Sequence, residues 1–427
     1  MNKIDMLLVY PNPSLESPYR FTPLSILFAG AFFEKQGKTV EYFDERFDSL
    51  ELFDELVGQS KEIGVSCFTG YQCLRTAELL TRAKAINEKI ITGVGGIHVQ
   101  ILPQQVIREK FVDRVWIDKS YGEDLFPYND KTKKHFMRTD MQYFTSRGCP
   151  FNCSFCAMRM KWQPKPIDEI DRELKILHKD IGFKTISFSD PNVAVGDNVF
   201  RVNRIRDVGS ILRDINVDWY GNIRADSLTP EMVDALVYSK CKYMEIGCES
   251  GDDYFLKKVI RKGYGVETIK TAVRNISGSG ISVMYSFMAN TPQETPEMLN
   301  KTLDLIDWIV ATDEDARVSI HNYFPYPGTP MYLNAVNGIG YPKFAPPTDL
   351  RGWGETNYML SPLYWISGLC FRQDVSHKNF KGKDWELIKP YIELAQKKWK
   401  ERDITEFPCN EVEQLIEKQV KKNERRK

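Results

Sequence analysis

The sequence has no excess charge of either sign and no long apolar run. Lysine and arginine total 58 and aspartate and glutamate also total 58, so the formal net charge is zero. A neutral chain has no overall attraction to nucleic acid or to an anionic membrane, so we expect no nucleic-acid partner and instead a small-molecule or peptide substrate. No apolar run approaches the roughly 20 residues that span a bilayer, so we expect no membrane span.

Paired cysteine spacing and an apolar N-terminal signal region are also absent. The chain has nine cysteines, but disulfide frameworks belong to oxidising compartments and to chains that carry an export signal. We therefore expect free or ligand-bound thiols and a cytoplasmic location.

Three of these cysteines, Cys149, Cys153 and Cys156, form a CxxxCxxC run in the segment TSRGCPFNCSFCAM. Three thiolates at this spacing can hold a 4Fe-4S cluster and leave its fourth iron open, because a closed cluster needs four protein ligands. Half of a zinc site is the alternative, but a closed zinc site needs a fourth Cys or His at motif spacing. No such residue follows, and the five histidines are scattered singly at His98, His135, His178, His321 and His377.

The N-terminal part alternates strand-like apolar runs with helical stretches, which predicts an α/β fold with a parallel sheet. The expected strands cover 4–10, 40–43, 63–68, 90–94 and 112–117, and the expected helices cover 23–36 and 71–87. Repeated units of this size predict a Rossmann-like domain over residues 1–128, and ligands of such sheets lie outside the carboxyl ends of the strands.

A polar, lysine-rich stretch at 129–140 is typical of an interdomain linker. Six further strand-helix units predict a partial (β/α)6 barrel of the TIM type over 141–333, whose chemistry lies in the loops at the carboxyl ends of its strands. The cysteine run occupies such a loop after the first strand. Helical stretches with four tryptophans predict a C-terminal, mostly helical cap over the barrel at 334–427.

The cysteine run resembles that of the radical S-adenosylmethionine (SAM) enzymes. In that family the amino and carboxylate groups of SAM chelate the open iron, and an electron from the cluster cleaves SAM to a 5′-deoxyadenosyl radical. The resemblance therefore implies a 4Fe-4S cluster, SAM, and an external one-electron reductant such as flavodoxin or ferredoxin. It also implies the partial barrel.

Four more residues lie at positions that the resemblance connects with SAM. Phe155 matches the aromatic position between the second and third cysteines, near the adenine. Asp190 ends the second barrel strand, where family members often hold the SAM amino group, although the usual glycine-rich form is absent. Arg224 ends the third strand, and its guanidinium suits a carboxylate. Glu249 closes the fourth strand and resembles the Gly-x-Glu-Ser turn beside the SAM ribose. A helix cap or a salt bridge is the alternative role of each.

Residues 1–128 resemble the cobalamin-binding domain that precedes the cluster domain in one large radical SAM subgroup. The segment 23–27 (PLSIL) and the Gly-Gly-Ile-His segment at 95–98 carry this resemblance. The DxHxxG sequence, whose His ligates cobalt in many other cobalamin proteins, is absent, and an empty or degenerate domain is the alternative. The resemblance implies cobalamin contacts at Ser66, Thr69, Gly70, Gly95, Gly96 and His98.

Together these features predict a radical SAM enzyme, and the leading hypothesis is cobalamin-dependent methylation of an unactivated carbon. In this scheme one SAM supplies the methyl group through cobalt and a second supplies the radical. One alternative is a cobalamin-independent dehydratase, epimerase or cyclase with a relict N-terminal domain, and another is a cluster-bearing electron-transfer protein. RNA methylthiolation is disfavoured, because the sequence has no second cysteine trio and no basic C-terminal module.

Overall fold

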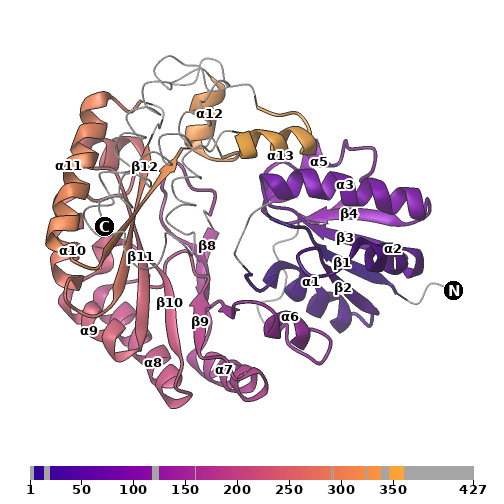
Figure 1. Cartoon of the computed structure of the whole chain (residues 1–427), viewed down its shortest axis with the longest axis horizontal. Helices are drawn as coiled ribbons and strands as arrows, with labels where there is room; N and C mark the ends of the chain where they lie inside the picture. Colours follow the sequence, from indigo (N-terminus) through magenta and orange to yellow (C-terminus); the bar gives the residue numbers. More distant parts are fainter. Residues whose placement is uncertain are drawn as a thin grey trace, which may run out of the picture. The chain divides into compact units, whose positions relative to one another are not determined.

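The computed structural model describes residues 4–13, 20–117, 125–158, 160–289, 291, 293–323, 326–337 and 346–359. These residues form two compact units (Figure 1). The N-terminal unit consists of the described residues of Met1–Gln142, Lys179–Gly182 and Ala345–Met359, and the second unit contains the rest. The change from one unit to the other falls next to residue 141, where the sequence predicts that the barrel begins.

The N-terminal unit is built on a five-stranded parallel sheet in the order β2-β1-β3-β4-β5. Strands β1 to β3 are almost wholly buried because helices lie above and below the sheet in Figure 1, whereas the edge strand β5 is partly exposed. The predicted Rossmann-like fold is confirmed. The elements in chain order are β1 (Met6–Tyr10), α1 (Leu24–Lys35), β2 (Val40–Asp44), α2 (Leu50–Gln59), β3 (Glu62–Ser66), α3 (Tyr71–Ile86), β4 (Ile91–Gly95), α4 (Ile97–Ile101), α5 (Pro103–Val106), β5 (Arg114–Val115) and α6 (Lys133–Met137).

The second unit contains a six-stranded sheet in the order β13-β12-β11-β10-β9-β6, and the pairs from β9 to β13 are parallel. Helices α8 to α11 cover its outer side (Figure 1). The predicted partial barrel is therefore confirmed. The elements that build it are β6 (Gln142–Tyr143), α7 (Ile167–Ile181), β9 (Thr185–Phe188), α8 (Asn198–Asp214), β10 (Asp218–Ile223), α9 (Pro230–Tyr238), β11 (Cys241–Glu249), α10 (Val266–Ile276), β12 (Ser282–Ala289), α11 (Pro296–Thr312) and β13 (Ala316–Asn322).

Two further strands flank the cysteine run, and the sequence does not predict them as a pair. The strands β7 (Ser146–Cys149) and β8 (Met160–Pro164) form a separate antiparallel sheet with a register shift between Arg147 and Cys149. The cysteine loop is therefore closed at its base by an antiparallel strand pair.

Three helices of the second unit begin at a Thr-Pro pair. The hydroxyls of Thr229, Thr295 and Thr329 each accept a hydrogen bond from the amide three residues later, and proline takes the first helical position. This arrangement satisfies one otherwise unpaired amide and places proline where its missing N–H costs nothing. The local sequence thus determines where α9, α11 and α12 (Pro330–Val336) start.

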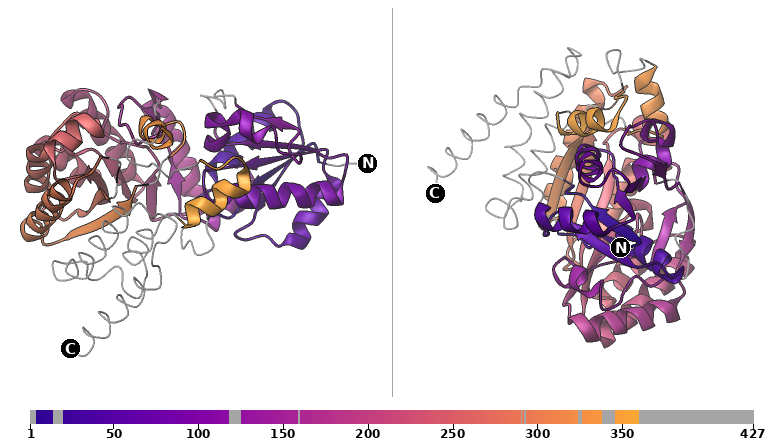
Figure 2. Two further views of the ribbon diagram at one scale, coloured as in Figure 1. Left: turned by 90° about the horizontal axis from the view of Figure 1, so that it is seen from above. Right: turned by 90° about the vertical axis from the view of Figure 1, so that its right-hand side faces the viewer.

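The last described helix, α13 (Leu350–Met359), belongs to the N-terminal unit, where it packs against α3 (Figures 1 and 2). The sequence predicts this segment as part of a cap over the barrel, and α13 departs from that prediction because its apolar face is buried against α3. The remaining predicted cap, 360–427, lies outside the described residues.

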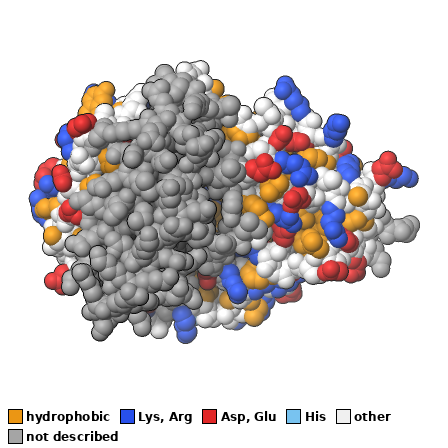
Figure 3. Space-filling view, turned by 45° about the horizontal axis from the view of Figure 1, so that its top comes forward, with side chains coloured by type: hydrophobic (Ala, Val, Ile, Leu, Met, Phe, Trp, Pro, Cys, Tyr) orange, Lys and Arg blue, Asp and Glu red, His pale blue; other side chains and the backbone are white. Residues whose placement is uncertain are grey.

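The visible part of the described surface carries basic and acidic side chains side by side, without a large area of one sign (Figure 3). This mixture agrees with the zero net charge of the chain. Among the described helices, none is both long and apolar enough to cross a membrane.

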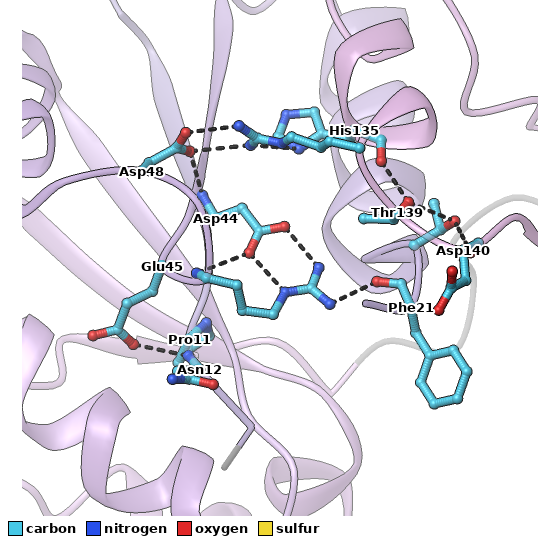
Figure 4. Close-up of polar contacts among 12 residues, drawn as sticks. Pro11, Asn12, Phe21, Asp44, Glu45, Asp48, His135, Thr139 and Asp140 are labelled. Atoms are coloured by element: carbon cyan, nitrogen blue, oxygen red, sulfur yellow. Dashed lines mark hydrogen bonds and ion pairs between the residues drawn. The ribbon is translucent and has the colours of Figure 1, made fainter. Parts of the chain in front are cut away.

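The stretch predicted as a linker, 129–140, is an integral part of the N-terminal unit. It contains α6, and its last turn is tied to the loop after β2. There the Arg138 guanidinium donates to Asp48 at 2.9 Å and 3.2 Å (Figure 4). Composition alone misleads here, because it does not reveal that a charged residue of the stretch has a fixed partner 90 residues earlier.

A second arginine organises the same loop. Arg46 donates to both carboxylate oxygens of Asp44 at 2.8 Å and 2.7 Å and to the Phe21 carbonyl oxygen at 2.7 Å (Figure 4). Its guanidinium also lies 4.5 Å from the centre of the Tyr10 ring. Both side chains are buried at the ion pair, so the bidentate contact with Asp44 fixes the guanidinium. The same guanidinium then joins the end of β2 to the end of β1 through the Tyr10 ring.

We predict that Arg138→Ala loosens α6 without disturbing the sheet. Loss of a charge-assisted pair with Asp48 should lower the free energy of local opening by about 1.5–3 kcal/mol. Hydrogen–deuterium exchange of peptides from 129–140 should accelerate, while exchange in β1 and β3 stays unchanged. Lys61→Ala, which removes an exposed ion pair to Asp5 in the same unit, is the control and should change little. Equal exchange in both variants would contradict a role for Arg138.

Candidate active site

The cysteine loop begins at Gly148, a position where any other residue would strain the backbone. Gly148 has φ +74°, and a Cβ atom there would collide with the Lys161 carbonyl oxygen on the neighbouring strand. Glycine adopts this left-handed conformation at little cost. Cys149 therefore leaves the β7–β8 pair on a sharply turned backbone that directs the loop away from the strands.

Ser154 ties the middle of the cysteine loop to two other parts of the unit. Its amide donates to the Ile260 carbonyl oxygen at 3.0 Å, and its hydroxyl donates to the Val259 carbonyl oxygen at 2.7 Å. The Met331 amide at the start of α12 donates to the Ser154 carbonyl oxygen at 3.2 Å. The backbone between Cys153 and Cys156 is thus held from both sides.

Asp190 lies fully buried beneath the start of the loop. Its carboxylate accepts hydrogen bonds from the Thr145 amide at 2.8 Å, the Thr145 hydroxyl at 2.7 Å and the Ser146 hydroxyl at 2.6 Å. Burial raises the pKa of Asp190, and these hydrogen bonds and Arg204 offset part of the shift. The structure therefore shows Asp190 supporting the strand that leads to the cysteines; its predicted contact with the SAM amino group stays a prediction.

Arg224, after β10, lies against the second cysteine of the run. Two of its nitrogens donate to the Asp226 carboxylate at 3.0 Å and 2.9 Å, and Nη1 lies 3.8 Å from Cys153 Sγ. The guanidinium also lies 3.7 Å from the centre of the Phe151 ring. Asp226 binds the Nε and Nη2 side of the guanidinium, so Nη1 is the nitrogen that lies next to Cys153.

Glu249 closes β11 in a conformation that its backbone rarely adopts. Its φ is +67°, and the pairing of β11 with β12 shifts register between Gly247 and Glu249. A bulge of this kind redirects a side chain at the end of a strand. The Glu249 carboxylate pairs with Lys262 Nζ at 2.9 Å, and both side chains are almost completely buried.

Lys262 brings a second cation to the site. Burial disfavours its charge, but Glu249, Tyr264 and Cys153 favour it and raise its pKa overall. Its ammonium lies 5.9 Å from the centre of the Phe155 ring, so the predicted adenine-side residue is a neighbour of this pair. The structure thus brings Phe155, Arg224 and Glu249 together around the cysteine loop, and their contacts with SAM stay a prediction.

The three thiols lie close enough to influence one another. Burial raises the pKa of Cys149 and of Cys156, and each thiol also feels the charge of Cys153. Arg224 and Lys262 act in the opposite direction on Cys149. The two cations thus favour the deprotonated, iron-binding form of a thiol.

A second group of predicted residues lies at the carboxyl edge of the N-terminal sheet. Strand order reverses at β1, which has β2 on one side and β3 on the other, and ligands of such sheets bind at this point. Ser66, at the end of β3, is buried and its hydroxyl lies 2.8 Å from that of Ser25 on α1. Thr69 and Gly70 follow in the loop before α3.

The glycines after β4 keep this edge free of side chains. A Cβ atom on Gly95 would meet only the Trp116 side chain, at 3.8 Å. Gly96 has φ +94°, and a Cβ atom there would lie 2.6 Å from the Cys67 carbonyl oxygen. The loops after β3 and β4 can therefore approach each other, because Gly96 carries no Cβ atom that would collide with the loop after β3.

His98 is fully buried and does not line this edge. Its Nδ1 lies 2.9 Å from the Thr69 hydroxyl, and its ring meets the Trp353 ring edge-on at 5.7 Å between centres. Burial lowers the pKa of His98 to about 4, so the ring is neutral near pH 7. His98 therefore differs from the other five predicted cobalamin residues, because its side chain is buried beneath the loops that carry them.

Comparison with protein families identifies both units. Residues 143–306 match the Radical SAM superfamily, and residues 14–127 match the B12 binding domain. The chain therefore contains a radical SAM domain and, before it, a B12-binding domain. The first match contains all three cysteines of the run, and the second contains the edge formed by the loops after β3 and β4.

Several curated proteins are similar to this radical SAM chain. An uncharacterized methyltransferase, PH0819, of Pyrococcus horikoshii is 29% identical over 332 residues, which cover 64% of this chain and 69% of the relative. The ribosomal protein uS12 methylthiotransferase RimO of Carboxydothermus hydrogenoformans is 28% identical over 37% of this chain and 38% of its own length. The bacteriochlorophyllide d C-12(1)-methyltransferase of Chlorobaculum tepidum is 24% identical over 44% and 41%. The chain thus spans less than half of the last two relatives.

Two solved structures share the fold across both units. The radical SAM methyltransferase TsrM of Kitasatospora setae, with cobalamin and a 4Fe-4S cluster bound, aligns with a TM-score of 0.64 at 17% identity and covers 83% of this chain and 85% of its own. The cobalamin-dependent radical SAM enzyme OxsB, with aqua-cobalamin and SAM bound, aligns with a TM-score of 0.66 at 17% identity and covers 92% and 72%. At this level of identity the likeness establishes the fold.

The family matches imply a 4Fe-4S cluster, SAM and cobalamin, and the residues present fit all three. Within the described part of the chain, no three His, Cys, Asp or Glu side chains gather as they would around a single metal ion. A cluster needs no such convergence, because each thiolate binds a different iron. The cysteine loop with its two cations suits the cluster and SAM, and the glycine-lined sheet edge suits cobalamin.

Sequence reasoning misses Lys262 and Ser154. Lys262 lies 13 residues after its partner Glu249, a spacing that no local pattern explains. It reaches the site because a π-helix, η2 (Phe255–Val259), and the turn after it lead the chain back. Ser154 lies inside the cysteine run, where a small polar residue between two ligands is a weak signal of a hydrogen-bonded loop.

We predict that Asp190→Asn weakens retention of the radical SAM cluster. An asparagine side chain cannot accept from Thr145 and Ser146 with both of its polar atoms, so the strand before Cys149 loses part of its support. Changes of this kind behind a metal site typically cost about 10–100-fold in affinity. Iron and sulfide per chain should fall after anaerobic reconstitution and desalting. Asp171→Asn, on the exposed face of α7, is the control, and equal iron in both variants would exclude a supporting role for Asp190.

We also predict that the loss of stability caused by Lys262→Met is partly restored by a second change at its partner Glu249. Alone it leaves the Glu249 carboxylate buried without its cation, which should cost about 3–5 kcal/mol in the free energy of unfolding. The double variant Lys262→Met/Glu249→Gln should be more stable than Lys262→Met, as measured by urea unfolding under anaerobic conditions. Lys257→Met removes an exposed pair to Asp253 and should have little effect. Additive losses in the double variant would show that the two residues are not coupled.

Proposed function

We propose that this enzyme is a cobalamin-dependent methyltransferase that methylates an unactivated carbon of a small-molecule or peptide substrate. The observation that carries the proposal is the presence, in one chain, of a cysteine loop with cationic neighbours and a B12-binding unit with a glycine-lined edge. The relative named as a methyltransferase, at 29% identity over 332 residues, supports it.

When bound, the cluster and SAM supply a radical and cobalamin supplies a route for the methyl group. The residues of this chain bind and orient. We assign Arg224 and Lys262 to the negative charge of the thiolates and of the SAM carboxylate, and Phe155 and Glu249 to the adenosine part of SAM. Glu249 suits this task because the bulge at the end of β11 sets its direction.

The inner face of the barrel supports a polar substrate. Strand register places Glu245 beside Met284 and Gly247 beside Ser286, so the side chains of Glu245, Met284 and Ser286 share one face. Ser319 Oγ donates to Ser286 Oγ at 3.1 Å. Burial raises the pKa of Glu245, and Ser286 offsets part of the shift. A half-buried carboxyl group next to two hydroxyls favours a substrate with hydroxyl or amino groups.

The proposal includes an external one-electron reductant, flavodoxin or ferredoxin, because reductive cleavage of SAM consumes an electron that has to be supplied to the cluster. It also includes a cytoplasmic location. All seven cysteines in the described part of the chain are free thiols, as expected in a reducing compartment.

The test separates the two uses of SAM. The anaerobically reconstituted protein receives reductant, SAM, hydroxocobalamin and a panel of polar candidate substrates, and the two nucleoside products are measured. We expect S-adenosylhomocysteine to form only with cobalamin, and 5′-deoxyadenosine to form together with it when a methylated product appears. The variant Cys149→Ala/Cys153→Ala/Cys156→Ala should lose 5′-deoxyadenosine completely.

Formation of 5′-deoxyadenosine alone, at a rate unchanged when cobalamin is withheld, would exclude the methyltransferase. It would support a dehydratase, epimerase or cyclase with a relict N-terminal domain. Retention of SAM cleavage in the triple cysteine variant would exclude radical SAM chemistry at this loop.

A further inference from the structure

Helix α13 follows the barrel in sequence but completes the B12-binding unit in space. Trp353 is fully buried there, and its indole N–H donates to Gln105 Oε1 at 2.9 Å. Gln105 Nε2 donates in turn to the Pro347 carbonyl oxygen at 2.7 Å, and the Leu350 amide donates to Glu109 Oε1 at 2.8 Å. Three hydrogen bonds therefore fix the start of α13 to the region of α5.

The fit of α13 against α3 is close. A Cβ atom on Gly354 would collide with Leu74, so this glycine allows the two helices to approach until their backbones nearly touch. Both helices belong to the N-terminal unit. Trp353 is adjacent to Gly354, and its indole is fully buried in the N-terminal unit where the two helices approach each other.

The indole meets His98, and His98 stands at the junction of two loops. The His98 amide donates to the Cys67 carbonyl oxygen at 3.2 Å, and the Cys67 amide donates to the Gly95 carbonyl oxygen at 2.9 Å. His98 Nδ1 lies 2.9 Å from the Thr69 hydroxyl. One imidazole thus connects α13 with the loop after β3 and with the loop after β4.

His98 cannot serve the ligand directly. Its side chain has no exposed surface, and Nε2 is buried with no hydrogen-bond partner among the described residues. An imidazole nitrogen left unpaired in the interior costs free energy. The ring is held by its Nδ1 contact with the Thr69 hydroxyl and by packing against the Trp353 ring. Any effect of His98 on a ligand has to pass through Thr69 and the backbone of the two loops.

We propose that Trp353 is a positioning residue for cobalamin, which acts through His98 and Thr69 to hold the loops after β3 and β4 at the binding edge. The segment that follows the barrel is then a required part of the B12-binding unit. This inference rests on the cobalamin part of the proposed function. It adds a positioning role for Trp353, which lies outside both the cysteine run and the sheet edge.

The experiment measures binding of hydroxocobalamin to the full-length protein by anaerobic absorbance titration. We expect Trp353→Ala to weaken affinity about 10–100-fold, as loss of a residue behind a ligand-binding shell does. Trp353→Phe keeps a ring against His98 but loses the indole N–H, so its affinity should fall less than that of Trp353→Ala and no more than that of Gln105→Leu. Arg351→Ala, on the exposed side of α13, is the matched control and should bind as the parent does.

Hydrogen–deuterium exchange without cobalamin distinguishes positioning from general unfolding. In Trp353→Ala, exchange should accelerate in 66–70 and 95–98 and stay unchanged in α8 to α11. Gln105→Leu, which removes the indole partner without opening a cavity in the core, should shift affinity and exchange in the same direction but less. This second variant tests the inference even if Trp353→Ala fails to fold.

Two failures have different meanings. If the parent protein binds hydroxocobalamin and both Trp353→Ala and Gln105→Leu bind it equally well, the positioning role is overturned and the proposed function stands. If the parent protein does not bind hydroxocobalamin, the cobalamin part of the proposed function and this inference are both overturned.

Discussion

The active site depends on keeping two positive charges beside three thiols, of which Cys153 is buried and Cys149 and Cys156 are half-buried. Neighbouring thiolates repel one another in a medium of low dielectric constant, and a cluster held by three of them would keep negative charge on the loop. Arg224 and Lys262 supply the opposing charge. Each is held in place by its own carboxylate, Asp226 for the arginine and Glu249 for the lysine. Without these carboxylates the cations themselves would be costly to bury.

The support for this arrangement comes from parts of the barrel that are distant in sequence. Asp190 holds the strand before the first cysteine, and Ser154 ties the centre of the loop to the carbonyl oxygens after η2. Rigid support matters because a site that transfers electrons and radicals must place its reactants closely and exclude others. Parallel strands make it possible, since their carboxyl ends gather loops from the whole sheet at one edge.

In the B12-binding unit, too, residues distant in sequence support the loops of the binding edge, but they do so without charged pairs. Its loops carry glycines and small polar residues instead of charges. They are supported by the buried His98 ring, which in turn packs against Trp353 of α13. Trp353 and Gln105 are 248 residues apart in sequence and in direct contact, so a helix encoded after the barrel becomes part of the first unit. Domain borders read along the chain therefore do not coincide with the compact units of the structure.

The sequence by itself determined the parallel strands of the two sheets, most of the helices between them, and the cysteine run. Buried parallel strands appear as continuous apolar runs, Thr-Pro pairs mark helix starts, and three cysteines at close spacing need no fold to be recognised. Only the tertiary structure decided that 129–140 packs onto the first unit, that Lys262 pairs with Glu249, and that His98 lies behind the ligand edge. The physical reason is that local pattern records which face of an element is buried, whereas partners across the chain are chosen by packing and charge compensation, which no short segment contains.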